Sequence, residues 1–144
     1  MEIQIRVLHP DAVIPHDAHP GDGGWDVAAV EDCVIRARGG RAVVATGIAV
    51  AIPEGYGGFV LPRSGLATHH GVTCVNAPGL IDSGYRGEVK VALVNLDPEH
   101  DYAIRKGDRI AQLVVMPLSV PQFRVVDALD ESSRAGAGFG STGR

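Results

Sequence analysis

The sequence predicts an all-β fold with many tight turns. Short runs rich in Val and Ile recur along the chain, and 19 glycines and 9 prolines are scattered between them as turn residues. At the N-terminus, Ile3, Ile5 and Val7 alternate with other side chains, which is typical of a strand with one buried face. A chain of 144 residues fits one domain and can bury a useful core.

The first half of the chain alternates between turn-rich and apolar segments. Residues 9–20 are polar, hold three prolines and are expected to form a loop. Gly47 lies within a long apolar run and predicts a bulge or bend there. Strands are therefore expected at residues 25–29, 33–37, 41–52 and 59–61.

Residues 62–71 predict the end of a strand followed by a short helix. Pro62 stops the strand, Ser64 can cap the helix and Gly71 can end it. A helix start with free N–H groups, a hydroxyl and the guanidinium of Arg63 is suited to binding phosphate. A simple connection between strand and helix is the alternative interpretation of the same residues.

Residues 76–95 contain two short apolar runs around a turn-rich centre and predict a β-hairpin. Asp82 then lies at the hairpin corner, with Tyr85 three residues further on. An Asp followed by Ser and Gly is common in turns, so turn formation alone is one interpretation of Asp82. A general base beside an aromatic platform is the other.

Two polar residues lie within otherwise apolar strands. Asp26 has apolar neighbours, and a half-buried carboxylate there needs a partner cation or hydrogen-bond donors. Gln112 lies in the strand predicted after the turn at 106–108, so its amide is either structural or directed at a ligand.

The C-terminal residues 132–144 cannot form a core, and their composition is typical of a disordered tail. They nevertheless combine Arg134, Phe139 and a Gly-Ser-Thr run, and glycine backbones with hydroxyls can wrap phosphates. We therefore predict a β domain over residues 1–131 and a flexible arm over 132–144.

Charge and composition narrow the function classes. A net charge of −4 gives none of the basic surplus of a nucleic-acid binder. Cys33 and Cys74 form neither a disulfide framework nor a metal-ligand pattern and are expected to be free thiols. No apolar run reaches the roughly 18 residues of a membrane span, and the N-terminus lacks a secretory pattern. A cytoplasmic protein that binds neither nucleic acid nor membranes is expected.

Five segments, in one order, resemble the five motifs of the trimeric dUTPase family, the enzymes that hydrolyse deoxyuridine triphosphate. They cover residues 24–27, 62–67, 76–94, 107–114 and 134–143. Departures are small: Ala135 and Ala137 replace glycines of the last motif, and Trp25 and Val27 vary the first. The resemblance implies a homotrimer of jelly-roll-like subunits with active sites at the interfaces. Each site would take its first, second and fourth motifs from one subunit, the hairpin from another and the tail from the third.

The resemblance also implies a reaction, dUTP and water giving dUMP and pyrophosphate, which limits uracil in DNA and supplies dUMP for thymidylate synthesis. Asp82 would orient the water for in-line attack on the α-phosphorus. Tyr85 would pack under the deoxyribose and exclude a 2′-hydroxyl. The base edge would be read by the hairpin, through Asn76, Gly79, Leu80, Ile81 and Lys90.

The resemblance assigns the triphosphate to the remaining motifs. Arg63, Ser64 and the Gly65 N–H would hold the α- and β-phosphates. Mg²⁺ would be bound by substrate phosphates and water, with Asp26 and Gln112 contacting it through water. The arm would close last, with Phe139 over the uracil and the γ-phosphate held by Arg134, Gly140, Ser141 and Thr142.

Two alternatives differ from this reading. The dCTP deaminases share the hairpin resemblance but usually have Arg-Ser-Ser in the second motif and a catalytic Glu on the following strand. Gly65 and Ala92 stand at the corresponding positions here. A non-catalytic nucleotide-binding module is the second alternative, and the presence of Asp82, Arg63 and Gln112 argues against it because a pure binder needs no base.

Overall fold

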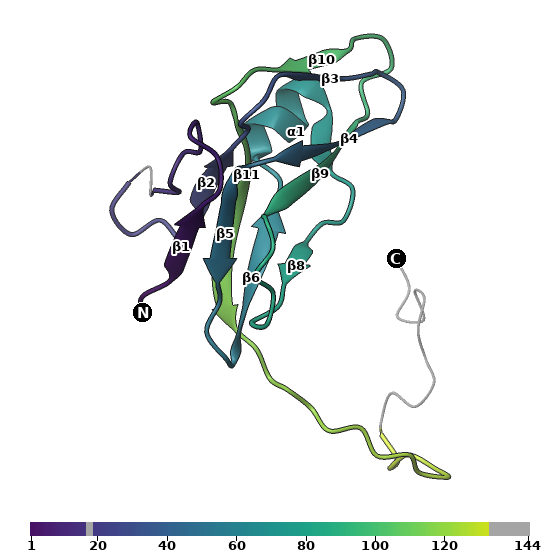
Figure 1. The fold of residues 1–144 in the computed structure, drawn as a ribbon. Helices are drawn as coiled ribbons and strands as arrows, with labels where there is room; N and C mark the ends of the chain where they lie inside the picture. Colours follow the sequence, from purple (N-terminus) through teal and green to yellow (C-terminus); the bar gives the residue numbers. More distant parts are fainter. Residues whose placement is uncertain (17–18, 133–144) are drawn as a thin grey trace.

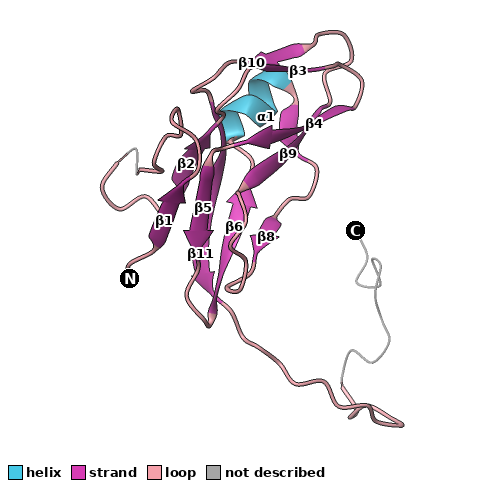
Figure 2. Cartoon of the chain, viewed as in Figure 1, coloured by secondary structure: helices cyan, strands magenta, loops and turns pink. Residues whose placement is uncertain are grey.

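Short antiparallel strands and one helix form the body of the protein (Figures 1 and 2). The computed structural model describes residues 1–16 and 19–132. The predicted all-β fold with one short helix is confirmed. The elements are β1 (Gln4–Val7), β2 (Trp25–Ala28), β3 (Cys33–Ile35), β4 (Gly40–Ala45), β5 (Ile48–Ala51), β6 (Tyr56–Leu61), α1 (Ser64–His70), β7 (Val72–Cys74), β8 (Gly79–Ile81), β9 (Lys90–Asn95), β10 (Tyr102–Ile104) and β11 (Arg109–Pro117).

The strands form two larger sheets and two strand pairs. One sheet has the order β2-β11-β6-β8 and the other the order β4-β9-β7, while β1 pairs with β5 and β3 with β10. Their inward side chains make one core of Val, Ile and Leu, including Ile35, Val91, Leu93 and Ile110. Alternation along β9 shows how it is built, because every second residue from Val91 is buried. Within the described ranges, no helix is both long and apolar enough to cross a membrane.

The strand predicted over 41–52 is divided into β4 and β5. Gly47 separates them with φ +68°, and a Cβ there would lie 2.7 Å from His9 Cβ and 2.8 Å from Val30 Cγ1. The backbone turns sharply where only glycine fits. The two halves consequently join different partners, β4 with β9 and β5 with β1. The predicted bend at Gly47 is confirmed, and the single long strand is wrong.

The predicted hairpin over 76–95 is also wrong in its pairing. β8 pairs with β6, and β9 pairs with β4 and β7, so the two arms belong to different sheets. Residues 82–89 connect them, a longer link than the two to five residues of a typical hairpin. Asp82 therefore lies where the chain crosses from one sheet to the other.

Ser64 does not cap the helix. The N-cap residue is Arg63, with extended backbone angles and no side-chain capping bond. Ser64 is already the first residue of α1, and its carbonyl accepts a hydrogen bond from Thr68 Oγ1 at 2.8 Å. The predicted end at Gly71 is confirmed by its left-handed backbone.

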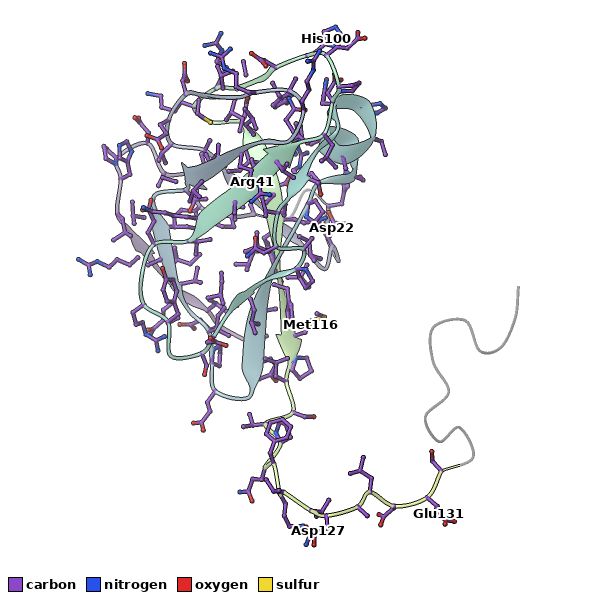
Figure 3. All side chains as sticks on the ribbon, turned by 90° about the vertical axis from the view of Figure 1, so that its right-hand side faces the viewer. Asp22, Arg41, His100, Met116, Asp127 and Glu131 are labelled. Atoms are coloured by element: carbon purple, nitrogen blue, oxygen red, sulfur yellow. The ribbon has the colours of Figure 1, made fainter. Side chains whose placement is uncertain are left out.

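After Pro117 the chain leaves the body. Residues 118–132 form no strand or helix and extend away from the sheets, and side chains such as Asp127 and Glu131 project from this segment (Figures 1 and 3). Phe123 is 94% exposed and Val125 is 99% exposed. Large apolar side chains are therefore open to solvent along this segment.

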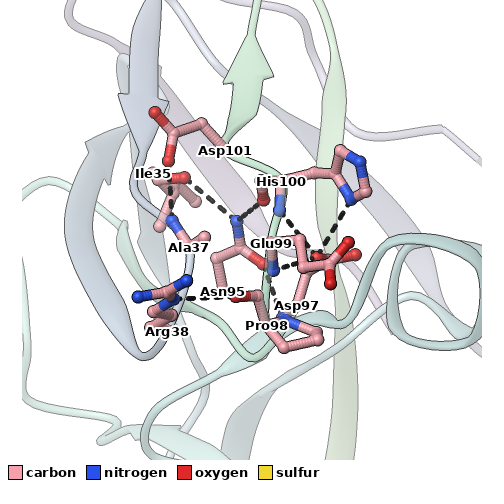
Figure 4. A network of polar contacts seen from close by, with 9 residues as sticks. All are labelled: Ile35, Ala37, Arg38, Asn95, Asp97, Pro98, Glu99, His100 and Asp101. Atoms are coloured by element: carbon pink, nitrogen blue, oxygen red, sulfur yellow. Dashed lines mark hydrogen bonds and ion pairs between the residues drawn. The ribbon is translucent and has the colours of Figure 1, made fainter.

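A buried asparagine joins the end of β3 to the loop between β9 and β10 at one end of the body (Figure 4). Asn95 is fully buried, and its Nδ2 donates to the carbonyls of Ile35 at 3.1 Å and His100 at 2.9 Å. Its Oδ1 accepts the N–H of Asp97 at 2.9 Å. The Asp97 carboxylate in turn accepts the N–H groups of Glu99 and His100.

We predict that Asn95→Ala lowers the free energy of unfolding by about 2–4 kcal/mol, because the buried Ile35 carbonyl and the part-buried His100 carbonyl lose their amide donor. Chemical denaturation measures this change. Asn76→Ala, at an exposed position, is the matched control and should change stability by less than about 0.5 kcal/mol. Equal stability of the two variants would contradict the role given to Asn95.

We also predict that this end of the body loosens in acid. The N–H groups of Glu99 and His100 lower the pKa of Asp97 from its ordinary value of 3.8. A carboxyl with a lowered folded-state pKa stabilises the fold above its unfolded pKa, and this contribution is lost as the pH falls through the folded value. The melting temperature of Asp97→Asn should therefore depend less on pH below about 4 than that of the wild type. Parallel melting curves for both proteins across that range would refute it.

Candidate active site

The first cleft of the candidate site is built by strand register. Gln112 on β11 lies opposite Asp26 on β2 and opposite Leu61 on β6. Residues opposite each other in antiparallel strands share one face, so Asp26 and Gln112 point the same way. Arg63 lies two residues after the end of β6. The cleft has a volume of about 330 Å³ and is lined by Asp22, Gly23, Gly24, Asp26, Arg63, Ser64, Gly65 and Gln112.

Asp26 is held between two arginines. Its Oδ1 forms an ion pair with Arg63 Nε at 3.0 Å, and its Oδ2 accepts a hydrogen bond from Arg109 Nη1 at 2.9 Å. The carboxylate is only 17% exposed. The expected partner cation is thus confirmed, and there are two. Arg63 is also fixed from its other side, since its Nη1 donates to the Arg109 carbonyl at 3.0 Å.

Arg109 was missed by sequence reasoning. It precedes Gln112 by three residues, and in a regular strand an odd separation places side chains on opposite faces. The register shifts between Arg109 and Ala111, so Arg109 lies opposite Ala28 while Gln112 lies opposite Asp26. This β-bulge turns Arg109 toward the same side as Gln112. An irregularity of this kind is not visible in the sequence.

Gln112 is both structural and directed at the cleft. Its Nε2 donates to the Pro62 carbonyl at 3.0 Å, which ties β11 to the segment carrying Arg63. Its Oε1 lies so near Gly24 that a Cβ there would be 2.7 Å away. Gly24 therefore leaves the room that the glutamine side chain occupies. The structural interpretation of Gln112 is confirmed, and its contact with a ligand stays a prediction.

A second cleft lies beside the connection between β8 and β9. Its volume is about 240 Å³, and it is lined by Leu80, Ile81, Asp82, Tyr85, Glu88, Val89 and Lys90. Tyr85 donates its hydroxyl to the Glu88 carbonyl at 3.0 Å. Its ring lies against Gly87, where a Cβ would be 2.6 Å from Cζ. The ring is therefore fixed as one wall of the cleft, and the Asp82 carboxylate is exposed beside it.

Glu88 is a further residue that sequence reasoning missed. Its Oε1 accepts the N–H of Gly47 at 2.9 Å, and its Oε2 lies 3.5 Å from Lys90 Nζ. Lys90 thus faces a protein carboxylate. Asn76 does not line this cleft. Its side chain lies close to Gly79, where a Cβ would be 3.1 Å from Asn76 Nδ2.

The two clefts are at opposite ends of β6. Ile81 pairs with Gly58, so Asp82 lies beside the start of β6, whereas Arg63 follows its end. At about 3.3 Å per residue, this stretch of strand separates them by roughly 15–20 Å. The structure therefore brings together Asp26, Arg63, Ser64, Gly65 and Gln112 in one cleft and Leu80, Ile81, Asp82, Tyr85 and Lys90 in the other.

The described residues include no group of three or more His, Cys, Asp or Glu side chains that could hold a metal ion. The first cleft does offer hard oxygen groups, namely two carboxylates and the Gln112 amide. Both oxygens of Asp26 already contact arginines, so this donor set suits water-mediated contact to Mg²⁺ better than direct ligation. The predicted arm residues Arg134, Phe139, Gly140, Ser141 and Thr142 lie outside the described residues.

Comparison with known proteins gives one answer. The dUTPase family model matches residues 11–143. The deoxyuridine 5′-triphosphate nucleotidohydrolase of Thermobifida fusca is 53% identical over 143 residues, covering 99% of this chain and 79% of that protein. The enzyme of the same name from Tropheryma whipplei is 49% identical over 140 residues, covering 97% and 95%.

Solved structures agree. The dUTPase of Staphylococcus bacteriophage 80alpha with dUpNHpp superposes with a TM-score of 0.91 at 32% identity, over 99% of both chains. A variant dUTPase from phage phi11 of S. aureus, solved to describe a structural Mg(II) ion, superposes with a TM-score of 0.82 at 28% identity, over 91% of this chain and 100% of that one. The fold is thus that of a nucleotide-hydrolysing class of jelly-roll-like proteins. The chain belongs to the dUTPase family.

Proposed function

We propose that the protein hydrolyses dUTP to dUMP and pyrophosphate. The observation that carries this conclusion is the first cleft, where Arg63, Ser64 and Gly65 face Asp26 and Gln112. A guanidinium, a hydroxyl and a backbone N–H on one wall provide the donors that phosphate oxygens accept. The family relationship supplies the nucleotide, since the curated relatives carry the name of a dUTP nucleotidohydrolase.

Arg63, Ser64 and the Gly65 N–H hold the α- and β-phosphates in this proposal. The ion pair with Asp26 and the bond to the Arg109 carbonyl fix the guanidinium before substrate arrives. A preorganised donor costs little reorganisation during the reaction, and it stabilises charge that develops on the phosphoryl group.

Mg²⁺ bound to the substrate phosphates would supply charge neutralisation at the phosphoryl oxygens. Asp26 and Gln112 line the cleft and would contact this ion through water. Direct ligation by Asp26 is disfavoured because its carboxylate already pairs with two arginines. Gln112 stays in place through its bond to the Pro62 carbonyl.

Asp82 acts as the base at the second cleft. Its exposed carboxylate can accept a proton from the attacking water. Tyr85 supports the deoxyribose. Asn76 and the backbone of Gly79, Leu80 and Ile81 read the uracil edge. Lys90, held by Glu88, contributes its strand's backbone to that edge.

The reaction requires a site shared between chains. Reacting atoms must approach within about 3–3.5 Å, whereas Asp82 and Arg63 of one chain lie at the two ends of β6. We infer that the first cleft of one subunit faces the Asp82 cleft of another in a homotrimer with dUTP as substrate. This explains why one chain holds two half-sites.

Exposed apolar surface supports the assembly. On the outer face of the β4-β9-β7 sheet, Val43 is 67% exposed and pairs with Ala92, and Val94 pairs with Arg41. The extended segment 118–132 presents further apolar side chains away from its own body. Such surface is stable in water when a partner covers it. Residues 132–144 would then reach the site of a neighbouring subunit as a closing arm.

A cytoplasmic location, and the lack of nucleic-acid or membrane partners, remain predictions. In that setting the reaction would limit uracil incorporation into DNA and would supply dUMP for thymidylate synthesis.

The first test concerns the base. We predict that Asp82→Asn binds a non-hydrolysable dUTP analogue normally, while turnover of dUTP falls about 10²-fold or more, because the shape is kept and the proton acceptor is lost. Pyrophosphate release and calorimetric titration measure the two effects. Asp11→Asn, which changes charge equally at a surface pair with Lys106, is the control and should retain full turnover. Near-normal turnover of Asp82→Asn would overturn the assignment.

The second test concerns assembly. Asp82→Asn subunits and subunits truncated before Arg134 should each be inactive alone. Co-expressed, they should regain activity, because a site that combines an intact Asp82 from one subunit with an arm from another is complete. Random trimers from equal amounts would contain such a combination in about a quarter of their sites. Mixed trimers, verified by mass spectrometry, that show no recovery would contradict the shared site, as would full activity of a monomer.

A further inference from the structure

We propose that Arg109 is a positioning residue for phosphate binding. It acts through Asp26 and orients Arg63 toward the phosphate chain. This inference rests on the proposed function of the first cleft, but it concerns a residue outside the cleft's lining.

Both contacts that hold the Arg63 guanidinium involve Arg109, one directly and one through Asp26. Its backbone carbonyl accepts from Arg63 Nη1 at 3.0 Å. Its own Nη1 donates to Asp26 Oδ2 at 2.9 Å, and the other oxygen of that carboxylate faces Arg63 Nε at 3.0 Å. Removing the Arg109 side chain would release one oxygen of Asp26 and let the carboxylate rotate. Arg63 would then lose the fixed partner that sets its direction.

The charges of the cleft give the second reason. Two carboxylates, Asp22 and Asp26, and one guanidinium, Arg63, line the first cleft. A lining with this balance repels a polyphosphate. Arg109 offsets one carboxylate from behind, so Arg63 need not neutralise Asp26 alone. The side chain of Asp26 is 17% exposed, where solvent weakens such interactions much less than on an open surface.

The β-bulge makes this arrangement specific. The register shift between Arg109 and Ala111 is what places the guanidinium on the side of Asp26. Arg105, on the preceding turn, has the same charge, but its side chain pairs with Asp32 at 3.2 Å on the surface. It is therefore a matched control for the loss of one positive charge near the same strand.

The experiment compares Arg109→Gln, Arg109→Lys and Arg105→Gln. The probes are inorganic tripolyphosphate, which has only the phosphate chain, and deoxyuridine, which has none. We expect Arg109→Gln to bind tripolyphosphate about tenfold or more weakly than the wild type, with deoxyuridine binding unchanged within about twofold. The tripolyphosphate deficit should shrink as salt is raised. Arg105→Gln should match the wild type, and Arg109→Lys, which keeps the charge, should recover part of the affinity.

A structural role alone predicts a different pattern. A folded Arg109→Gln that binds tripolyphosphate within twofold of Arg105→Gln would overturn the proposal. So would equal losses for tripolyphosphate and deoxyuridine. If Arg109→Gln does not fold, Arg109→Lys decides: a selective deficit for tripolyphosphate supports the proposal, whereas near-normal binding or an equal deficit for both probes overturns it. Tripolyphosphate binding does not depend on the base, so failure of the wild type to hydrolyse dUTP would refute the proposed function without deciding the role of Arg109.

Discussion

The pairing of β11 with both β2 and β6 is the constraint on which the candidate site depends. Gln112 lies opposite Asp26 on one side and opposite Leu61 on the other. This single register brings together three segments that are far apart in sequence, and it fixes where the chain must go after β6. The bond from Gln112 to the Pro62 carbonyl then holds that exit, so Arg63 is delivered beside Asp26. A slip of one residue would turn both polar side chains to the other face of the sheet.

Strand β6 leads into the first cleft at its end and separates that cleft from the Asp82 cleft near its start. β6 pairs with β11 along its length and with β8 near its start, and its ends carry Arg63 and the neighbourhood of Asp82 respectively. Strands packed on a shared core do not bend enough to close roughly 15–20 Å. In the proposed function, each chain is therefore rigid at both half-sites and needs a partner subunit for the reaction. The rigidity of the subunit and the proposed sharing of the site between subunits follow from one feature of the sheet.

The sequence predicts what is local and fails where pairing is distant. Asp26 and Gln112 could be identified because a polar side chain in an apolar run must find partners. The bend at Gly47 and the helix end at Gly71 could also be predicted, since a positive φ favours glycine. Arg109 could not, because only a bulge places it beside Asp26. The hairpin prediction failed because the two apolar arms around Asp82 find strands from elsewhere in the chain, and local turn residues carry no information about those partners.

Asp26 and Asp82 differ in burial and in the charged groups around them. Asp26 is largely buried, and both of its oxygens contact guanidinium groups. This carboxylate therefore fixes the position of Arg63. Asp82 is exposed at the edge of its cleft, and the nearby ammonium of Lys90 is directed to Glu88 at 3.5 Å. Glu88 in turn is fixed by the N–H of Gly47, at the bend that the core imposes. The Asp82 carboxylate itself is open to solvent. Of the two carboxylates, Asp82 is the exposed one, and in the proposed function it is the base.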